Sequence, residues 1–448
     1  MVLLVGPFYV FSFTPLSPAD EKFHWEQTLQ AAVRISRNLS VDESLSLDMF
    51  RPNNRNLPEG YVRLANTFRL PNRKAGTIDW GDKRWEKHGT WAMHSTQIAG
   101  VIAGLQLGAP PLAVFYLGRI FSLLAYAGIV FWAIRSSPFF NRSLAVAASC
   151  PIAMQQVCSY SYDAESLTMS FLCFALAAKN ISENEKPFDC ITGLCMIAAV
   201  AVGMSMKCAA FPFLPLLFLL PTSRFRSGMS GKLRFLFLVA TVAIGMALTC
   251  FSVTPSALWN KPLGELAYGG SSWTLALIAS NPLKVCFLLL NSFDLFGQIL
   301  LYDAFGGNMS GLSLRLYTHI TMIFIVMFFI AAFKDGEEIR FRPVARLRMA
   351  AACGWILLTV YLLFIMLTSW TPDSSTTILG LQGRYWTPVL PLAAVALFAW
   401  YKEPGSDGLI CRGSGSIPEI PFDRFLFPIM MLAHCDAIIC IVKATLKN

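Results

Sequence analysis

Two adjacent carboxylates and a histidine follow the first apolar run of this chain. Asp20, Glu21 and His24 lie in the stretch "SPADEKFHW" at residues 17–25. Carboxylates held at a boundary of low dielectric have an altered proton affinity, and they can bind a divalent cation such as Mg²⁺ or Mn²⁺. The stretch therefore predicts a general base or a metal ligand. The alternative is electrostatic stabilisation of a helix start, where carboxylates are favoured.

A third carboxylate lies where one apolar run ends and the next begins. Asp163 is part of "SYSYDAES" at residues 159–166, and the hydroxyl of Tyr162 is one of several hydrogen-bond donors beside it. An ionisable residue at the edge of an apolar segment is a functional candidate. Asp163 is predicted to act as a second acidic group, either as a base or as a metal ligand together with Asp20 and Glu21. A plain polar turn between two helices is the alternative.

A basic and aromatic motif later in the chain is suited to phosphate. The stretch "LQGRYWTP" at residues 381–388 places Gln382, Arg384 and Tyr385 close together. The planar guanidinium of arginine binds phosphate in a bidentate manner, and tyrosine favours the level of lipid headgroups. These three residues are predicted to bind substrate, with an interfacial anchor of the helix as the alternative.

Two further cations lie inside apolar runs. Arg119 in "FYLGRIFSLLAY" and Lys207 in "GMSMKCAAFPFLP" have apolar neighbours on both sides. Each is predicted either to bind an anionic headgroup or to extend its charged end to the membrane surface while its aliphatic stem stays in lipid.

The composition indicates that most of the chain is built for lipid. Of its 448 residues, 55% are hydrophobic and only 14% are charged, and the mean hydropathy is +0.53. A soluble domain carries about 25% charged residues, whereas repeated apolar runs of about 20 residues suit the hydrocarbon core of a bilayer. The alternating pattern of an outer-membrane barrel is absent. The sequence therefore predicts an all-α polytopic membrane protein.

The basic residues behind the net charge of +9 are distributed as in a membrane protein. Basic residues gather in short loops between apolar runs, at 222–234 and 340–348. Such loops stay on the cytoplasmic side, so no nucleic-acid partner is expected.

The 12 cysteines are scattered, mostly within apolar runs and without metal-ligand spacing. This pattern favours apolar packing over disulfides or a metal cluster.

About 11 membrane-spanning helices are predicted from the apolar runs. They cover residues 1–17, 111–134, 143–160, 164–179, 188–206, 208–221, 233–253, 316–333, 349–369, 385–401 and 424–442. The first run is short and has no basic lead-in, which fits a first membrane helix with a truncated start better than a signal peptide. With the basic loops inside, runs 95–108 and 283–301 are predicted to be interfacial, because a crossing at either would break this orientation.

This topology divides the chain into five segments and collects the polar motifs on one face. The segments are a first membrane helix (1–17), a long extracytoplasmic loop with juxtamembrane helices (18–110), membrane helices (111–253), an extracytoplasmic segment with an interfacial helix (254–315) and a last set of membrane helices (316–448). The acidic motifs are expected to face outside the cytoplasmic membrane.

Taken in order, five stretches resemble a known family. They are "SPADEKFH", "YLGRIFSLLAY", "PIAMQQVCSYSYDAESLTMSFLCFALA", "MSMKCAAFPFLP" and "LQGRYWTPVLPLA". This order resembles the DUF2142 family of bacterial membrane proteins, which is placed among the GT-C-like integral membrane glycosyltransferases. The segment before "HSTQIAG" lacks the Tyr-Pro-Pro-rich pattern common in that family, which weakens any inference about substrate contacts there.

The resemblance implies a GT-C-like bundle and a glycosyltransferase activity. A cavity on the outer face would hold a polyprenyl-phosphate-linked sugar, and the sugar would pass to a surface glycan or lipid acceptor. By this resemblance Asp20 and Glu21 match the acidic motif of the first outer loop, His24 the following histidine, Asp163 the second acidic turn and Arg384 the basic turn.

An inverting transfer needs a carboxylate that deprotonates the acceptor hydroxyl and cations that stabilise the leaving phosphate. Asp20 or Glu21 is the expected base, and Arg384, Arg119 and Lys207 are the expected phosphate ligands. A transporter or flippase of lipid-linked saccharides is an alternative, and a non-catalytic scaffold is another. A transporter typically shows inverted repeats, which the sequence lacks.

Overall fold

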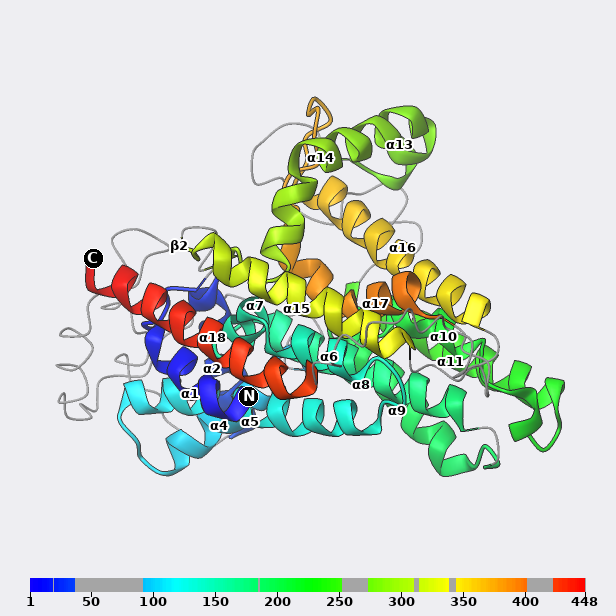
Figure 1. Cartoon of the computed structure of the whole chain (residues 1–448), viewed down its shortest axis with the longest axis horizontal. Helices are drawn as coiled ribbons and strands as arrows, with labels where there is room; N and C mark the ends of the chain where they lie inside the picture. Colours follow the sequence, from blue (N-terminus) through cyan, green and yellow to red (C-terminus); the bar gives the residue numbers. More distant parts are fainter. Residues whose placement is uncertain are drawn as a thin grey trace, which may run out of the picture.

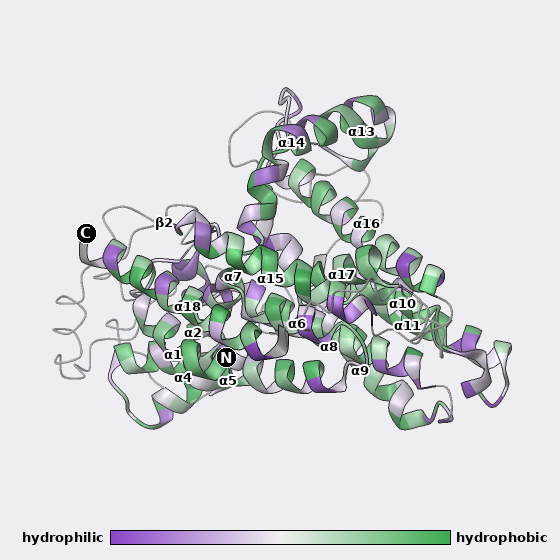
Figure 2. Cartoon of the chain, in the orientation of Figure 1, coloured by the Kyte–Doolittle hydropathy of each residue, from purple (hydrophilic) through white to green (hydrophobic). Residues whose placement is uncertain are grey.

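The computed structural model describes residues 1–18, 20–36, 92–183, 186–251, 273–309, 314–337, 344–400 and 422–447. Within these ranges the chain forms 16 α-helices and one two-stranded hairpin of four residues. The prediction of an all-α polytopic membrane protein is confirmed by these helices, of which six in the described ranges are long and apolar enough to cross a membrane. Figure 2 shows apolar residues along most of the length of the longer helices.

The helices before residue 252 are α1 (Val2–Ser12), α2 (Glu21–Ile35), α4 (Ser95–Gln106), α5 (Pro111–Ser136), α6 (Asn141–Ser149), α7 (Pro151–Val157), α8 (Tyr162–Ser182), α9 (Cys190–Ser205), α10 (Leu214–Leu217) and α11 (Met229–Phe251). Those that follow are α13 (Leu275–Ser280), α14 (Pro282–Asp303), α15 (Thr318–Glu337), α16 (Val344–Ser369), α17 (Leu390–Phe398) and α18 (Phe422–Lys447). Short 3₁₀ helices are η3 (Ala92–His94), η4 (Phe211–Phe213), η5 (Thr222–Arg224) and η6 (Gly383–Val389). Strand β1 (Asn308–Met309) pairs antiparallel with β2 (Leu314–Arg315).

The six candidate spans are α5, α11, α14, α15, α16 and α18, and α1 and α9 are shorter apolar helices. Three of the predicted spans are interrupted and are corrected here: 143–160 is divided into α6 and α7, 208–221 into η4 and α10, and 385–401 into η6 and α17. Proline lies at or near each interruption, and it removes a backbone donor and clashes with the preceding turn. Hydropathy alone averages over such breaks.

The two runs predicted to be interfacial differ from each other. Run 95–108 forms α4, which has 12 residues and is too short to span a bilayer core of about 30 Å. Run 283–301 lies within α14, whose 22 residues have the length and apolarity of a spanning helix. Length therefore gives no reason to exclude α14 from the bilayer. Figure 1 shows α13 and α14 projecting from the rest of the molecule beside the end of α16.

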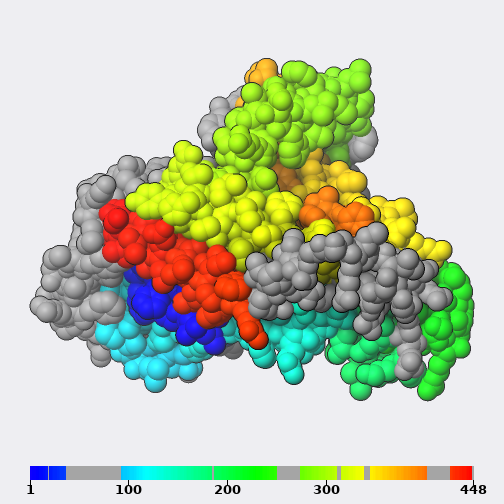
Figure 3. Space-filling model, viewed as in Figure 1, coloured from blue at the N-terminus to red at the C-terminus, as the bar shows by residue number. Residues whose placement is uncertain are grey.

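Segments distant in the sequence meet around α8. Helix α8 packs against α5, α9 and η4, and η6 packs against α8, α14 and α17. The last helix, α18, packs against α1 and α15, and Figure 3 shows it lying across the first helix. The start of α8, the turn after α9, the segment η6 and helix α16 are thereby brought to one place, where they enclose the candidate site.

Gly100 is required by the close packing of α4 on α5. A Cβ atom at this position would lie 2.5 Å from the carbonyl oxygen of Leu117 and 2.8 Å from the Cα atom of Gly118. Both are backbone atoms, so Gly100→Ala is expected to destabilise the fold by about 1–3 kcal/mol through overpacking. The measurement is the midpoint of thermal unfolding of the purified protein in detergent.

Gly128 is the matched control on α5, because a Cβ atom there meets nothing within 4 Å. Gly128→Ala is expected to leave the midpoint unchanged or to raise it, since alanine is favoured over glycine in a helix interior. Equal midpoints for the two variants would contradict the close packing of α4 on α5.

Candidate functional site

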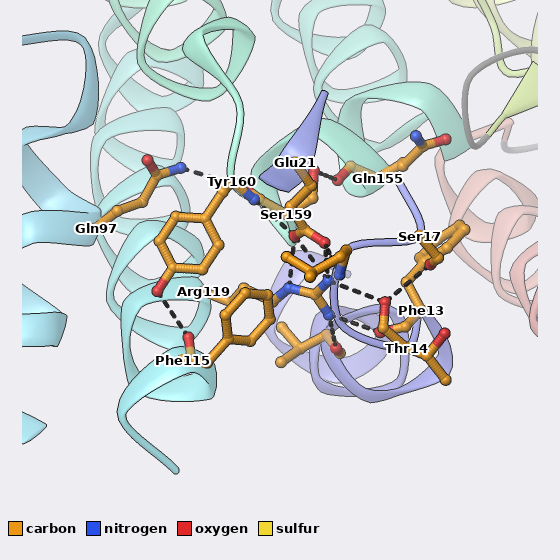
Figure 4. A network of polar contacts seen from close by, with 12 residues as sticks. Phe13, Thr14, Ser17, Glu21, Gln97, Phe115, Arg119, Gln155, Ser159 and Tyr160 are labelled. Carbon is orange, nitrogen blue, oxygen red and sulfur yellow. Dashed lines mark hydrogen bonds and ion pairs between the residues drawn. The ribbon is translucent and has the colours of Figure 1, made fainter. Parts of the chain in front are cut away.

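Glu21 and Arg119 form a fully buried ion pair at the centre of one polar network (Figure 4). Arg119 Nε donates to Glu21 Oε1 at 2.9 Å, and Arg119 Nη2 donates to Oε2 at 2.6 Å. The carboxylate also accepts hydrogen bonds from the backbone N–H groups of Leu16 at 2.8 Å and Tyr160 at 2.9 Å. Buried charges are tolerated only when they are paired and hydrogen-bonded to this degree.

Arg119 also binds the end of helix α1. Its Nη1 donates to the carbonyl oxygens of Val10 at 2.8 Å and Phe13 at 2.7 Å. The last carbonyls of a helix lack intrahelical partners and carry a partial negative charge, so a buried cation stabilises them. Arg119 thus connects α5 to the end of α1, and Glu21 connects both to the start of α2 and to the turn before α8.

This placement differs from the roles expected of Glu21 and Arg119. Neither side chain lines the cavity described next, and both are completely buried within the network. Because both side chains are fully buried and lie outside the cavity lining, neither is accessible to a ligand in the cavity. We interpret the pair as positioning the acidic motif, of which Glu21 is the anchor.

A cavity of about 630 Å³ begins one residue away, at Asp20. Part of its wall is polar and comes from α2, α7, α8, the turn after α9 and η6. Its polar lining residues are Asp20, His24, Gln156, Ser161, Tyr162, Asp163, Ser166, Ser170, Lys207, Arg384 and Tyr385. Another part is apolar and comes mostly from α16, with Leu358, Leu362, Ile365, Met366 and Trp370. The cavity is therefore amphipathic.

Asp163 lies between two cations in the polar wall. Lys207 Nζ donates to Asp163 Oδ1 at 2.6 Å, and Arg384 Nε lies 3.5 Å from Asp163 Oδ2. Burial raises the pKa of Asp163, but the charges of Lys207 and Arg384 and the hydrogen bond from Lys207 outweigh burial and lower this pKa to about 2. Asp163 therefore stays ionised at neutral pH. The carboxylate of Asp20 also lines the cavity and interacts electrostatically with Arg384, so the polar wall carries two cations and two carboxylates.

The lowered pKa of Asp163 also sets the sign of its effect on stability. The folded-state pKa, about 2, is below the ordinary value of an aspartate. The ionised carboxylate therefore stabilises the fold at pH values above that ordinary value, and this contribution is lost as the pH falls through about 2.

Local backbone geometry brings the two cations to Asp163. Lys207 and Cys208 follow α9 with φ angles of +51° and +54°, a left-handed conformation that is unfavourable for residues with a Cβ atom. Arg384 follows Gly383, where a Cβ atom would lie 2.0 Å from the carbonyl oxygen of Leu300. Only glycine lets η6 lie this close to the end of α14, and this contact holds Arg384 at the cavity.

Asp20 has a different environment from its neighbour Glu21. It is exposed, lines the cavity and precedes α2 in a left-handed conformation with a φ angle of +58°. Among the described residues, no cation lies within ion-pair distance of its carboxylate. The two adjacent carboxylates of the motif are thus separated, one facing the cavity and one buried.

His24 and Tyr162 form an aromatic part of the wall. Their rings meet edge to face with centroids 4.1 Å apart, and the ring of His94 lies 5.2 Å from that of His24. Burial and the charges of His94 and Lys207 lower the pKa of His24 well below its ordinary value. The imidazole of His24 is therefore neutral, and its Nδ1 is buried without a hydrogen-bond partner in the part of the chain that the structure describes.

Of the two neighbouring residues Gln382 and Tyr385, both predicted to bind substrate, only one lines the cavity. Tyr385 lines the cavity, whereas Gln382 does not, and the Gln382 carbonyl accepts a hydrogen bond from the backbone N–H of Tyr385 at 3.1 Å.

Gln156 was not predicted from any motif, but it lines the cavity from α7. A signal was present, because Gln155 and Gln156 interrupt an otherwise apolar run.

Two of the three predicted metal-ligating carboxylates are already engaged by cations. Asp163 is engaged by Lys207 and faces Arg384, and Glu21 is enclosed by Arg119. Within the ranges that the structure describes, no three side chains of His, Cys, Asp or Glu gather in a way that could hold a metal ion. The expected binding of Mg²⁺ or Mn²⁺ therefore has no matching donor set in these ranges.

Comparison with known proteins agrees with the resemblance in the sequence. The model of the family described as "Predicted membrane protein (DUF2142)" matches residues 82–393, which is more than half of the chain. The matched range includes Asp163, Lys207 and Arg384 and begins after Asp20. No curated protein and no solved structure gives a match.

Loss of the buried ion pair is expected to destabilise the fold. Arg119→Leu leaves the carboxylate of Glu21 buried without its cation, at a cost of about 3–5 kcal/mol. The measurements are the amount of folded protein in membranes and the midpoint of thermal unfolding. Glu26→Gln is the control, since among the described residues it removes the partly exposed pair with Lys22 at 3.6 Å, worth about 1 kcal/mol at most. A wild-type midpoint for Arg119→Leu would rule out the anchoring role.

Proposed function

Because the chain belongs to the DUF2142 family of predicted membrane proteins, we propose that its amphipathic cavity serves a reaction on a lipid-linked substrate. The proposed reaction is the transfer of a sugar from a polyprenyl-phosphate donor to a cell-surface glycan or lipid acceptor. This would make the protein a GT-C-type glycosyltransferase of the bacterial cytoplasmic membrane, acting in the assembly of a cell-envelope polysaccharide.

The observation that carries this proposal is the combination of two kinds of wall in one cavity. Lys207 and Arg384 supply two cations at the polar wall, on either side of Asp163. Leu358, Leu362 and other side chains of α16 supply an apolar surface. A ligand that satisfies both walls carries an anionic group joined to an apolar chain, as a polyprenyl phosphate does. The cations would bind the phosphate and α16 would contact the polyprenyl chain.

Asp20 is the carboxylate best placed to act as the base. It lines the cavity and has no cation within ion-pair distance among the described residues. Asp163 is already engaged by Lys207, and its neighbours lower its pKa to about 2, so it is poorly suited to accept a proton. A general base works best when its proton affinity is near the operating pH. We assign Asp163 instead to positioning Lys207 and Arg384.

The transfer is then a single displacement with inversion at the anomeric carbon. The acceptor hydroxyl gives its proton to the carboxylate of Asp20, and its oxygen forms the new bond to the anomeric carbon. The bond between that carbon and the phosphate oxygen breaks, and polyprenyl phosphate leaves with the bonding electron pair. Lys207 and Arg384 stabilise the negative charge that develops on the leaving phosphate.

The orientation of the basic loops supports a cavity on the extracytoplasmic face. Residues 222–234 and 334–348 carry the basic residues that favour the cytoplasmic side. In the proposed topology Asp20 and Asp163 lie at the opposite face, where polyprenyl-linked donors meet surface acceptors. The lipid bilayer is thus both the environment of the protein and the source of its donor.

Replacement of the base is expected to abolish transfer without unfolding the protein. In cells that make the native surface polysaccharide, Asp20→Asn is expected to lower transfer about 10²–10⁴-fold. The measurements are the glycan composition and the amount of polyprenyl-phosphate sugar at equal protein levels. We expect loss of one sugar from the glycan and accumulation of its lipid-linked donor. Glu26→Gln is the control, because Glu26 is a carboxylate on α2 that does not line the cavity.

An unchanged glycan in the Asp20→Asn strain, alongside an altered glycan in a deletion strain, would remove Asp20 as the base. That outcome would favour a transporter or a scaffold for lipid-linked saccharides.

Loss of a phosphate ligand is expected to weaken donor binding. Arg384→Gln removes a charge-assisted contact, so the affinity for farnesyl phosphate is expected to fall about 10- to 100-fold. Binding is measured with the full chain in lipid nanodiscs at low ionic strength. Arg346→Gln is the control, because Arg346 is exposed on α16 and does not line the cavity. Equal losses in the two variants would indicate general electrostatic attraction in place of a phosphate site.

A further inference from the structure

Gln156 in α7 is a cavity-lining residue to which the proposed transfer gives no role. Its side chain is 2% exposed, and both its Nε2 and its Oε1 are buried without a hydrogen-bond partner among the described residues. The great majority of buried polar groups in proteins are paired, and an unpaired amide destabilises the fold. Because Gln156 lines the cavity, a ligand in the cavity is the natural partner of this amide.

A second unpaired polar atom belongs to the same wall. His24 Nδ1 is buried and has no hydrogen-bond partner within the described ranges, and His24 also lines the cavity. The imidazole is neutral, since burial and the charges of His94 and Lys207 lower its pKa well below the ordinary value. The polar wall therefore has three unpaired atoms on uncharged groups, in addition to the cations that face the phosphate. Uncharged donors and acceptors are suited to hydroxyl groups.

We propose that Gln156 and His24 bind the sugar ring of the donor and select an uncharged, hydroxylated sugar. This inference rests on the proposed function and names the part of the substrate that the cations do not bind. An amide presents one donor and one acceptor side by side, which matches two neighbouring hydroxyl groups, and a neutral imidazole nitrogen accepts from a third. A sugar carboxylate would find no positive charge on these two residues to offset its desolvation.

Gln155 provides a matched control one residue earlier. It is 3% exposed, and so equally buried, but it does not line the cavity, and its side chain has no buried polar atom that lacks a partner among the described residues. Consecutive residues of an α-helix point about 100° apart. In Figure 4 the carbonyl oxygen of Gln155 accepts a hydrogen bond from the hydroxyl of Ser159, and the side chain of Gln155 extends away from Arg119 and Glu21.

The test measures binding of defined probes to the full chain in lipid nanodiscs. The probes are farnesyl phosphate and its phosphodiesters with glucose, galactose, mannose and glucuronic acid. The wild-type protein is expected to bind at least one uncharged-sugar ester more tightly than farnesyl phosphate. Gln156→Met is expected to weaken binding of that ester about 10- to 100-fold while the affinity for farnesyl phosphate is unchanged. Gln155→Met is expected to keep the wild-type preference.

Thermal unfolding separates ligand binding from a role in folding. Gln156→Met replaces an unpaired amide with an apolar side chain of similar size, so the midpoint without ligand is expected to stay the same or rise. Gln156→Leu gives the same comparison where the methionine variant does not fold.

Three results would overturn the assignment of Gln156 and His24. One is an equal loss of affinity for farnesyl phosphate and for the sugar esters in Gln156→Met, and another is an unchanged preference in that variant. The third is a wild-type preference for the glucuronic acid ester or for farnesyl phosphate itself. A wild-type protein that binds none of the probes would instead overturn the proposed function, and the inference with it.

Discussion

The buried pair of Arg119 and Glu21 is the interaction on which the candidate site depends. A carboxylate and a guanidinium without exposure to water are stable only because every strong partner is supplied by the protein. Those partners lie at the end of α1, in α5, at the start of α2 and in the turn before α8. Four elements that are separate in the sequence are therefore fixed relative to one another. The same junction places Asp20 and Asp163 at one cavity.

This constraint explains why two adjacent carboxylates have different roles. Glu21 is the first residue of α2 and is drawn into the interior by Arg119. Asp20 precedes the helix in a left-handed conformation and faces the cavity. An acidic residue that anchors the motif holds its neighbour in position without competing for protons at the cavity, because its own charge is already paired. The motif thus places a buried, paired carboxylate and a carboxylate that faces the cavity in consecutive positions.

Part of this arrangement was predictable from the sequence. Apolar runs and basic loops gave the membrane class, and the topology placed Asp20, Asp163 and Arg384 on one face. The pairing of Glu21 with Arg119 was not predictable, because the partners are 98 residues apart and local patterns carry no information on such contacts. Hydropathy also joined segments that prolines divide, since a window average does not register a missing backbone donor. The sequence-based predictions failed where the structure depends on a contact between distant residues or on a single proline.

The cavity wall contains groups that lower the stability of the folded protein when no ligand is bound. Gln156 and His24 keep buried polar atoms without partners, and Lys207 adopts an unfavourable backbone conformation. Such features persist only where the surrounding structure enforces them. Here the enforcement comes from the Arg119–Glu21 junction on one side and from the contact of η6 with α14 on the other. Unpaired groups held by rigid neighbours cannot turn toward one another, so their hydrogen-bonding capacity stays directed at the cavity. Rigidity at the junction and incomplete pairing in the wall are thus two parts of one arrangement, which preorganises the wall for a polar ligand.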